Sequence, residues 1–168
     1  DLGVEKVELD AQQITWHLVC KELERPFDKG RGYDLDESEL SRIHRRLLSS
    51  ECFSLVAEDK GRIVGLLEVE PSTWRRVGWI WNILIDVDCR GRGLGRQFVE
   101  RAVAWAQEHN LQALVAETQT NNVPACHFYA HLGFEPGGVD DHYYRYCGNP
   151  APAHDVALFW YLDVNASE

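Results

Sequence analysis

The sequence has no methionine, no C-x-x-C pair, no long apolar run and few basic residues. Its apolar runs fall short of the ~18 residues that a membrane-spanning helix needs, so we expect no membrane partner. The first residues lack the basic-then-apolar pattern of a secretion signal, and the missing methionine predicts a natural start before Asp1. These absences together predict a cytoplasmic protein.

The five cysteines are dispersed and odd in number, which argues against both a disulfide framework and a zinc cage. His127 and His131 have a spacing that suits two metal ligands on one helix. However, Phe128 stands where a zinc protease of the H-E-x-x-H type has Glu, so we expect structural histidines and no metal. Cys126 has no base partner nearby in the sequence, which favours a small packing side chain over a thiol nucleophile.

Positive charge is scarce, because 17 Lys and Arg stand against 27 Asp and Glu, a formal charge of −10. This balance argues against nucleic-acid binding, which usually requires a basic face. It is compatible with a cationic substrate attracted to an acidic opening, and equally with a charge that only keeps the protein in solution. Against this background, the stretch DCRGRGLGRQF (88–98) concentrates three arginines and three glycines, which predicts a bound anion.

The hydrophobic pattern predicts a single α/β domain over residues 1–168, since 45% hydrophobic residues suffice for one core. The predicted strands are 4–9, a hairpin of 52–59 and 62–70, a doubly covered central strand 79–87, and 111–117, 142–147 and 155–164. Residues 14–23 fit a strand or a helix, and residues 25–39 a polar loop. The predicted helices are 36–48, with Leu40, Ile43, Leu47 and Leu48 on one side, one from near Gly95 to His109–Asn110, and one within 118–133.

A glycine turn between a strand and a helix suits an anion, because glycines leave the backbone N–H groups open and the helix adds its positive end. Neither familiar nucleotide motif fits. A P-loop ends in G-K-[ST], whereas Arg96 and Gln97 follow Gly95, and Arg96 also breaks the dinucleotide pattern G-x-G-x-x-G. From the residues alone, a tight turn with solvated arginines remains the alternative.

The segment RGRGLG (90–95) fits R/Q-x-x-G-x-G/A, and with it the chain resembles the GNAT acyltransferase superfamily. The segment ETQTNNVPACHFYAHLGF (117–134) resembles the second signature of that superfamily. With the C-terminal ALFWYL, these blocks are similar to the streptothricin acetyltransferases and their uncharacterised relatives over about residues 52–163. The resemblance implies the GNAT fold, a central mixed β-sheet flanked by helices, with an acetyl-CoA cradle at about 79–134 and C-terminal strands at about 140–163.

The resemblance also implies roles for single residues. It assigns the pyrophosphate of acetyl-CoA to Arg90, Gly91, Arg92, Gly93, Leu94, Gly95 and Arg96, and its pantetheine arm to the strand edge at Ile83, Leu84 and Ile85. Asn122 corresponds to the Asn that contacts the co-substrate near its reacting end, although an N-cap role is compatible with the same position. Tyr129 corresponds to the Tyr proposed to protonate the departing thiolate, whereas helical spacing alone favours a core aromatic.

The general base is where the chain departs from its resemblance, because Trp81 and Asn82 stand where acidic residues are expected. Glu117 is the base candidate that we favour, and a water chain is an alternative. The further acidic candidates are Glu68, Glu70, Asp140 and Asp141. The tryptophans Trp74, Trp79 and Trp81 fit a substrate platform or ordinary packing.

These observations predict an acetyl-CoA-dependent N-acetyltransferase acting on a primary amine of a small cationic molecule, with a streptothricin-like antibiotic as the leading acceptor. A peptide or protein amine is one alternative, and a non-catalytic CoA-binding sensor is another. A binder of some other phosphorylated ligand is a third. The sequence leaves open whether the chain forms a homodimer.

Overall fold

The computed structural model describes residues 2–9, 13–20, 22, 37–146 and 156–165. The chain divides into two compact units, one of residues 31–116 with 161–168 and the other of residues 1–30 with 117–160. The larger sheet has the strand order β3-β4-β5-β6-β8-β7, which are residues Phe53–Asp59, Arg62–Ser72, Val77–Ile85, Ala113–Gln119, Ala157–Asp163 and Glu135–Asp140. It contains both antiparallel and parallel pairs, so the predicted central mixed sheet is confirmed. Within the described residues, no helix is long and apolar enough to cross a membrane.

The first unit begins its sheet with a hairpin of β3 (Phe53–Asp59) and β4 (Arg62–Ser72). Lys60 and Gly61 both have positive φ, as a two-residue hairpin turn requires, so the predicted hairpin is confirmed. The strand β5 (Val77–Ile85) pairs antiparallel with β4 and parallel with β6 (Ala113–Gln119). The parallel pairs run from Val77–Ala113 to Ile80–Ala116, and β5 continues beyond them to Ile85.

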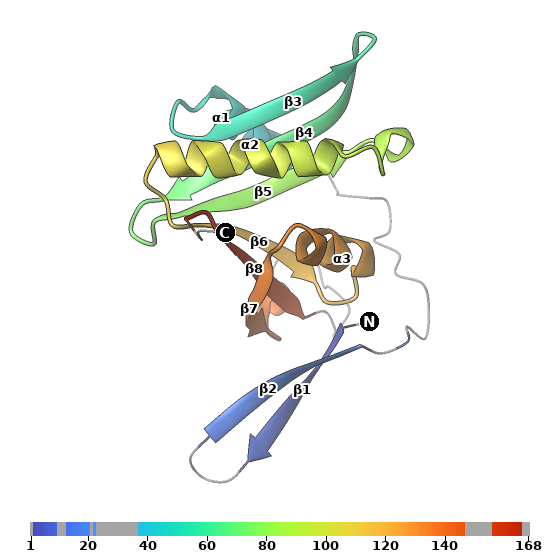
Figure 1. The fold of residues 1–168 in the computed structure, drawn as a ribbon, viewed down its shortest axis with the longest axis vertical. Coiled ribbons are helices and arrows are strands. Elements are labelled where there is room, and N and C mark those ends of the chain that lie inside the picture. Colours follow the sequence, from blue (N-terminus) through green and yellow to red (C-terminus); the bar gives the residue numbers. More distant parts are fainter. Residues whose placement is uncertain (1, 10–12, 21, 23–36, 147–155, 166–168) are drawn as a thin grey trace. The chain divides into compact units, whose positions relative to one another are not determined.

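Two helices cover opposite faces of this part of the sheet (Figure 1). The helix α2 (Leu94–Glu108) packs over Gly65 and Gly78, where a Cβ atom would come within 3.0 Å of the Phe98 ring and 3.3 Å of the Trp105 ring, respectively. Glycine therefore allows the helix to approach closely. On α1 (Glu37–Leu48), the Arg46 side chain reaches Glu68, three residues after Gly65 and hence on the other face of β4.

The helix α1 (Glu37–Leu48) buries a different side from the one predicted. Leu40, Leu47 and Leu48 are exposed, and the buried side chain is that of Arg46. The predicted apolar face is therefore wrong in these positions. Arg46 is buried because carboxylates lie beside it on both α1 and β4, and no count of apolar residues reveals such partners.

The second unit contains α3 (Val123–His131), β7 (Glu135–Asp140) and most of β8 (Ala157–Asp163). It also contains a hairpin of β1 (Leu2–Leu9) and β2 (Gln13–Cys20), so residues 14–20 form a strand rather than a helix. The strand predicted at 142–147 is wrong, because Tyr143–Tyr146 forms a 3-10 helix, η2. Residues 25–36 of the predicted loop lie outside the described residues.

The strand β7 was missed because its sequence, EPGGVD, combines a proline with two glycines that are rare in strands. Next to it, Tyr129 of α3 packs edge-on against Phe134 and stacks on Trp160 of β8, at ring-centroid distances of 5.1 and 6.2 Å. All three side chains are buried. They form the aromatic core of the second unit.

Candidate functional site

The glycine loop leaves the sheet at the end of β5 and enters α2 through a short 3-10 helix, η1 (Val87–Cys89). Its first half is tied back to the strand. The Asp86 carboxylate accepts a hydrogen bond from the backbone N–H of Asp88 at 3.0 Å, and Arg90 Nε donates to the Ile85 carbonyl at 3.1 Å. Cys89, the last residue of η1, is buried. The loop is therefore an ordered extension of the strand.

The second half of the loop leaves open space beside two of its glycines, Gly91 and Gly93. Gly91 and Gly93 have φ of 72° and 82°, a region that side chains with a Cβ rarely adopt. A Cβ built on either residue meets no atom within 4 Å. Gly93 is also the N-cap of α2, whose hydrogen bonding begins with the Gln97 N–H donating to the Gly93 carbonyl at 3.1 Å.

The N–H groups of the first helical turn, Leu94 to Arg96, precede that first bond and so have no acceptor within the helix. Arg90, Arg92 and Arg96 are exposed around them, and the first turn of α2 contains no acidic residue. Free N–H donors, a helix N-terminus and three guanidinium groups fit a diphosphate. The predicted pyrophosphate residues thus lie on one strand–loop–helix unit.

The strand before this loop contains a β-bulge. Glu68 of β4 faces Asn82, but the next residue, Val69, faces Ile80, so Trp81 is the extra residue of β5. Past the bulge, the predicted pantetheine residues Ile83, Leu84 and Ile85 pair with Leu67, Leu66 and Gly65, and their side chains are half-buried. The bulge had no signal in the sequence, because Trp81 continues the apolar pattern of the strand.

Behind the bulge lies a buried polar cluster of Arg46, Glu68 and Asn82. Glu68 Oε2 accepts from Asn82 Nδ2 at 2.6 Å and from an Arg46 guanidinium nitrogen at 3.3 Å. The three residues are 2%, 0% and 7% exposed, in that order. Two of the acidic candidates for the base are on β4. Glu68 lies beside Asn82, and Glu70, two residues further along the strand, is half-buried.

The second unit holds the predicted residues Glu117, Asn122 and Tyr129. Asn122 is the N-cap of α3 by position, and its carbonyl accepts from the N–H groups of Ala125 and Cys126 at 3.0 Å. Its side chain makes no capping hydrogen bond, so the amide is not used by the helix. Glu117, near the end of β6, is half-buried and accepts a hydrogen bond from the Tyr144 hydroxyl.

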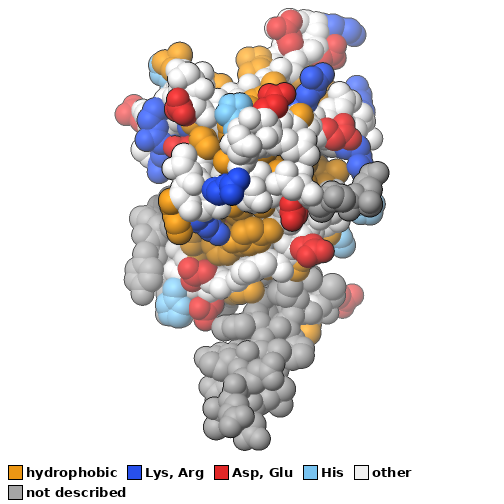
Figure 2. All heavy atoms as spheres, turned by 60° about the vertical axis from the view of Figure 1, so that its left-hand side comes forward, with side chains coloured by type: hydrophobic (Ala, Val, Ile, Leu, Met, Phe, Trp, Pro, Cys, Tyr) orange, Lys and Arg blue, Asp and Glu red, His pale blue; other side chains and the backbone are white. Residues whose placement is uncertain are grey.

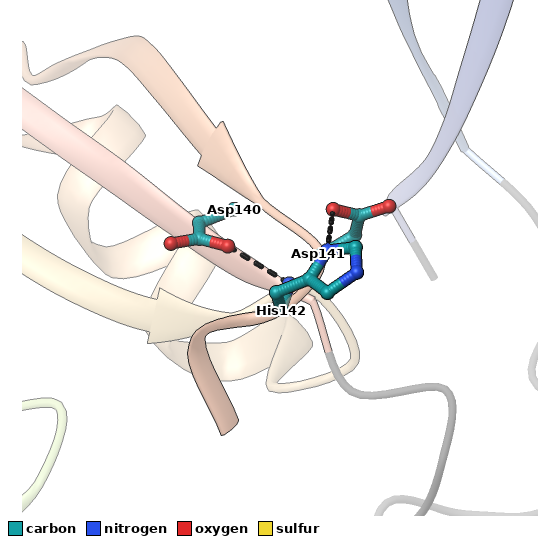
Figure 3. Close-up of side chains that lie close together, drawn as sticks. All are labelled: Asp140, Asp141 and His142. Atoms are coloured by element: carbon teal, nitrogen blue, oxygen red, sulfur yellow. Dashed lines mark hydrogen bonds and ion pairs between the residues drawn. The ribbon is translucent and has the colours of Figure 1, made fainter. Parts of the chain in front are cut away.

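The other two acidic candidates, Asp140 and Asp141, lie with His142 at the end of β7, close enough together to hold a metal ion (Figure 3). Hydrogen bonds explain their arrangement. Asp140 Oδ1 accepts from the His142 N–H at 2.8 Å, and His142 Nδ1 lies 2.7 Å from Asp141 Oδ1. Asp141 and His142 are exposed, as an ordinary polar turn permits. We assign no metal to them.

Cys126 is a buried side chain of α3, 3% exposed, with its sulfur 3.6 Å from the Thr118 hydroxyl. Burial raises the pKa of its thiol, so the neutral form is held at neutral pH. Because the thiolate is the reactive form, Cys126 is poorly suited to act as a nucleophile.

We therefore expect Cys126→Ala to keep kcat within about threefold of the wild-type value. The cost should be a modest loss of packing, visible as a fall of a few degrees in Tm. Steady-state kinetics beside thermal unfolding will measure both. Loss of turnover in a variant that still folds would place the thiol in the reaction.

The chain is similar to known proteins in both sequence and fold. The profile of the Acetyltransferase (GNAT) family matches residues 16–134. The chain is 31% identical to the streptothricin acetyltransferase of Escherichia coli over 95% of this chain and 91% of that protein. It is 29% identical to streptothricin acetyltransferase A of Bacillus subtilis (strain 168), over 88% of this chain and 79% of that protein.

A solved structure from Bacillus anthracis str. Ames, assigned as a streptothricin acetyltransferase and bound to acetyl coenzyme A, has a similar fold. It matches 95% of this chain and 82% of that chain, with a TM-score of 0.66 and 24% identity. The fold predicted from the sequence is thereby confirmed.

Proposed function

Since the chain belongs to the acetyltransferase (GNAT) family and uses acetyl-CoA, we propose that it acetylates a primary amine of a small cationic molecule, with a streptothricin-like antibiotic as the leading acceptor. The observation that carries the proposal is the similarity to two streptothricin acetyltransferases, at 31% and 29% identity over most of this chain. The net charge of −10 supports a cationic acceptor.

Acetyl-CoA supplies the acetyl group as a thioester. In the reaction, the amine nitrogen bonds to the acetyl carbon, the carbon–sulfur bond breaks, the amine loses a proton and the thiolate gains one. The glycine loop supports binding of the pyrophosphate, with the N–H groups of the first turn of α2 and the Arg92 side chain as donors. Holding both substrates in place contributes several kcal/mol to lowering the barrier.

We assign the role of general base, which accepts the proton from the amine, to Glu117. We assign the role of general acid, which donates a proton to the thiolate, to Tyr129. A carboxylate that already accepts the Tyr144 hydroxyl is held in one orientation, which suits a positioned base. Asn122 contributes a side-chain amide that the helix does not use, and we assign it to the co-substrate.

An acceptor screen tests the function. Release of free thiol from acetyl-CoA should be fastest with streptothricin when it is compared with aminoglycosides, polyamines and N-terminal peptides. Faster turnover of peptides would favour the protein-amine alternative. Tight acetyl-CoA binding without turnover on any amine would favour the CoA sensor, for which the absence of an acid at Trp81–Asn82 is the specific observation. Preference for ATP or NAD over CoA would contradict the proposal altogether.

Salt dependence tests the charge of the acceptor. On the face drawn in Figure 2, acidic and basic side chains are interspersed, so the attraction depends on particular acids as well as on net charge. We expect kcat/KM for a polycationic acceptor to fall severalfold between low and physiological ionic strength, because salt screens exposed carboxylates. A flat profile would remove the electrostatic argument.

Asp140→Asn and Asp141→Asn should weaken that salt dependence, because each removes one negative charge and keeps the shape of the side chain. The control is Glu58→Gln on the β3–β4 hairpin, which also removes one negative charge, at an exposed position. An equal change in all three variants would mean that only the net charge matters.

A further inference from the structure

The buried cluster of Arg46, Glu68 and Asn82 contacts both side chains of the β5 bulge, those of Trp81 and Asn82. In a regular strand, Trp81 and Asn82 would point to opposite faces of the sheet. Here the Arg46 guanidinium lies 5.4 Å from the centre of the Trp81 ring, and Asn82 donates to the carboxylate that Arg46 also contacts. Both side chains of the bulge are thus held on the side of α1.

The cluster is costly to bury. Arg46 Nε and Glu68 Oε1 are buried without a hydrogen-bond partner in the part of the chain that the structure describes. Buried ion pairs of this kind are weak contributors to stability, and apolar side chains of the same volume often stabilise a fold as well or better. Stability therefore does not explain the cluster, but its position beside the β5 bulge does.

The bulge lies on the strand that leads into the glycine loop. Between Asn82 and Arg90 the chain passes through the predicted pantetheine residues 83–85 and the turn of Asp86. A bulge sets the local twist of its strand and re-aims the residues around it, and bulges recur beside active sites for this reason. A contact that fixes the bulge therefore also fixes the direction in which these residues point.

We propose that Arg46, Glu68 and Asn82 are positioning residues that hold the bulge at Trp81 in the form that turnover requires. The proposal rests on the proposed function, since it concerns the same reaction. Arg46 is anchored for this role by Glu39, about two turns earlier on α1, at 3.1 Å. Glu68 receives both donors on the single oxygen Oε2, so one carboxylate couples the helix to the bulge.

The test compares Asn82→Ala with Arg45→Met, a control on α1 whose side chain is exposed. We expect Asn82→Ala to lower kcat at least tenfold and to change the acetyl-CoA dissociation constant less than threefold. Amide hydrogen exchange of residues 80–83, measured on the free protein, should quicken at least tenfold. The control should change none of the three.

Glu68→Gln separates positioning from proton transfer. The Gln carbonyl still accepts from Asn82, so positioning predicts that kcat stays within about threefold and that the pH profile is unchanged, whereas Glu68→Ala should lose at least tenfold. Equal losses in Glu68→Gln and Glu68→Ala, with the acidic limb of the profile gone, would make Glu68 the base and overturn the proposal. Unchanged exchange at residues 80–83 in Asn82→Ala would overturn it as well.

Failure of the proposed function would give a different result from failure of this proposal. If the wild-type protein binds acetyl-CoA and acetylates no amine, the enzyme assignment fails, yet hydrogen exchange still shows whether the cluster holds the bulge. Quickened exchange with normal turnover in Asn82→Ala would mean that the cluster holds the bulge without serving the reaction. That result also contradicts the proposal.

Discussion

Replacing Gly93 with Val should weaken acetyl-CoA binding at least tenfold while the fold survives. The N-cap of α2 has φ of 82°, and a β-branched residue resists this conformation by about 1–2 kcal/mol or more. The Val side chain would also occupy the open space beside the first helical turn, where no atom now lies within 4 Å of a built Cβ. The first effect shifts the N–H donors, and the second keeps the pyrophosphate from approaching them. Isothermal calorimetry with acetyl-CoA measures the loss.

The β3–β4 turn offers a matched control for this experiment. Gly61 has nearly the same φ, 79°, and the same open surroundings, but it lies in a hairpin turn and contributes to no predicted site. Gly61→Val should therefore cost a similar free energy of unfolding and leave the acetyl-CoA affinity unchanged. If both variants lose affinity equally, general destabilisation explains the effect. If neither does, the pyrophosphate binds elsewhere.

Local signals sufficed for much of the fold. The Lys60–Gly61 turn, the Gly93 N-cap and the end of α2 at His109 each depend on a few neighbouring residues, and each lies close to where the sequence predicts it. The glycine loop is predictable for the same reason. Its glycines, its arginines and the helix after it are consecutive in the chain, so spacing alone brings the predicted pyrophosphate donors together.

The features that the sequence did not reveal depend on partners far along the chain. Arg46 is buried because it meets Glu68, 22 residues away, and the bulge at Trp81 exists only in the register of β5 with β4. Periodicity treats an arginine as a solvent-facing residue, which is why the wrong face of α1 was predicted. The hydrogen bond between Glu117 and Tyr144 likewise joins residues 27 apart. Such pairs follow from the tertiary structure, and no short pattern encodes them.

Replacing Tyr129 with Phe should lower kcat about tenfold to a hundredfold and leave acetyl-CoA binding almost normal. The ring packs against Phe134 and Trp160 and is 5% exposed, so a Phe ring fills the same place. General-acid assistance typically contributes a factor of about 10²–10⁴. We expect the lower end or less, because a thiol with a pKa near ~8.5 is a fair leaving group even without protonation.

The measurement is steady-state kcat beside the acetyl-CoA dissociation constant and Tm for both proteins. The control is Phe128→Leu, which alters the neighbouring ring, 5.2 Å away, and removes no hydroxyl. A tenfold fall in kcat in Tyr129→Phe alone assigns the hydroxyl to the reaction. If kcat stays within about threefold, Tyr129 is only a core aromatic and another donor protonates the thiolate. If Tm falls by more than about 5 °C, the hydroxyl is a buried structural donor, because loss of the ring contacts cannot explain such a change when the ring remains.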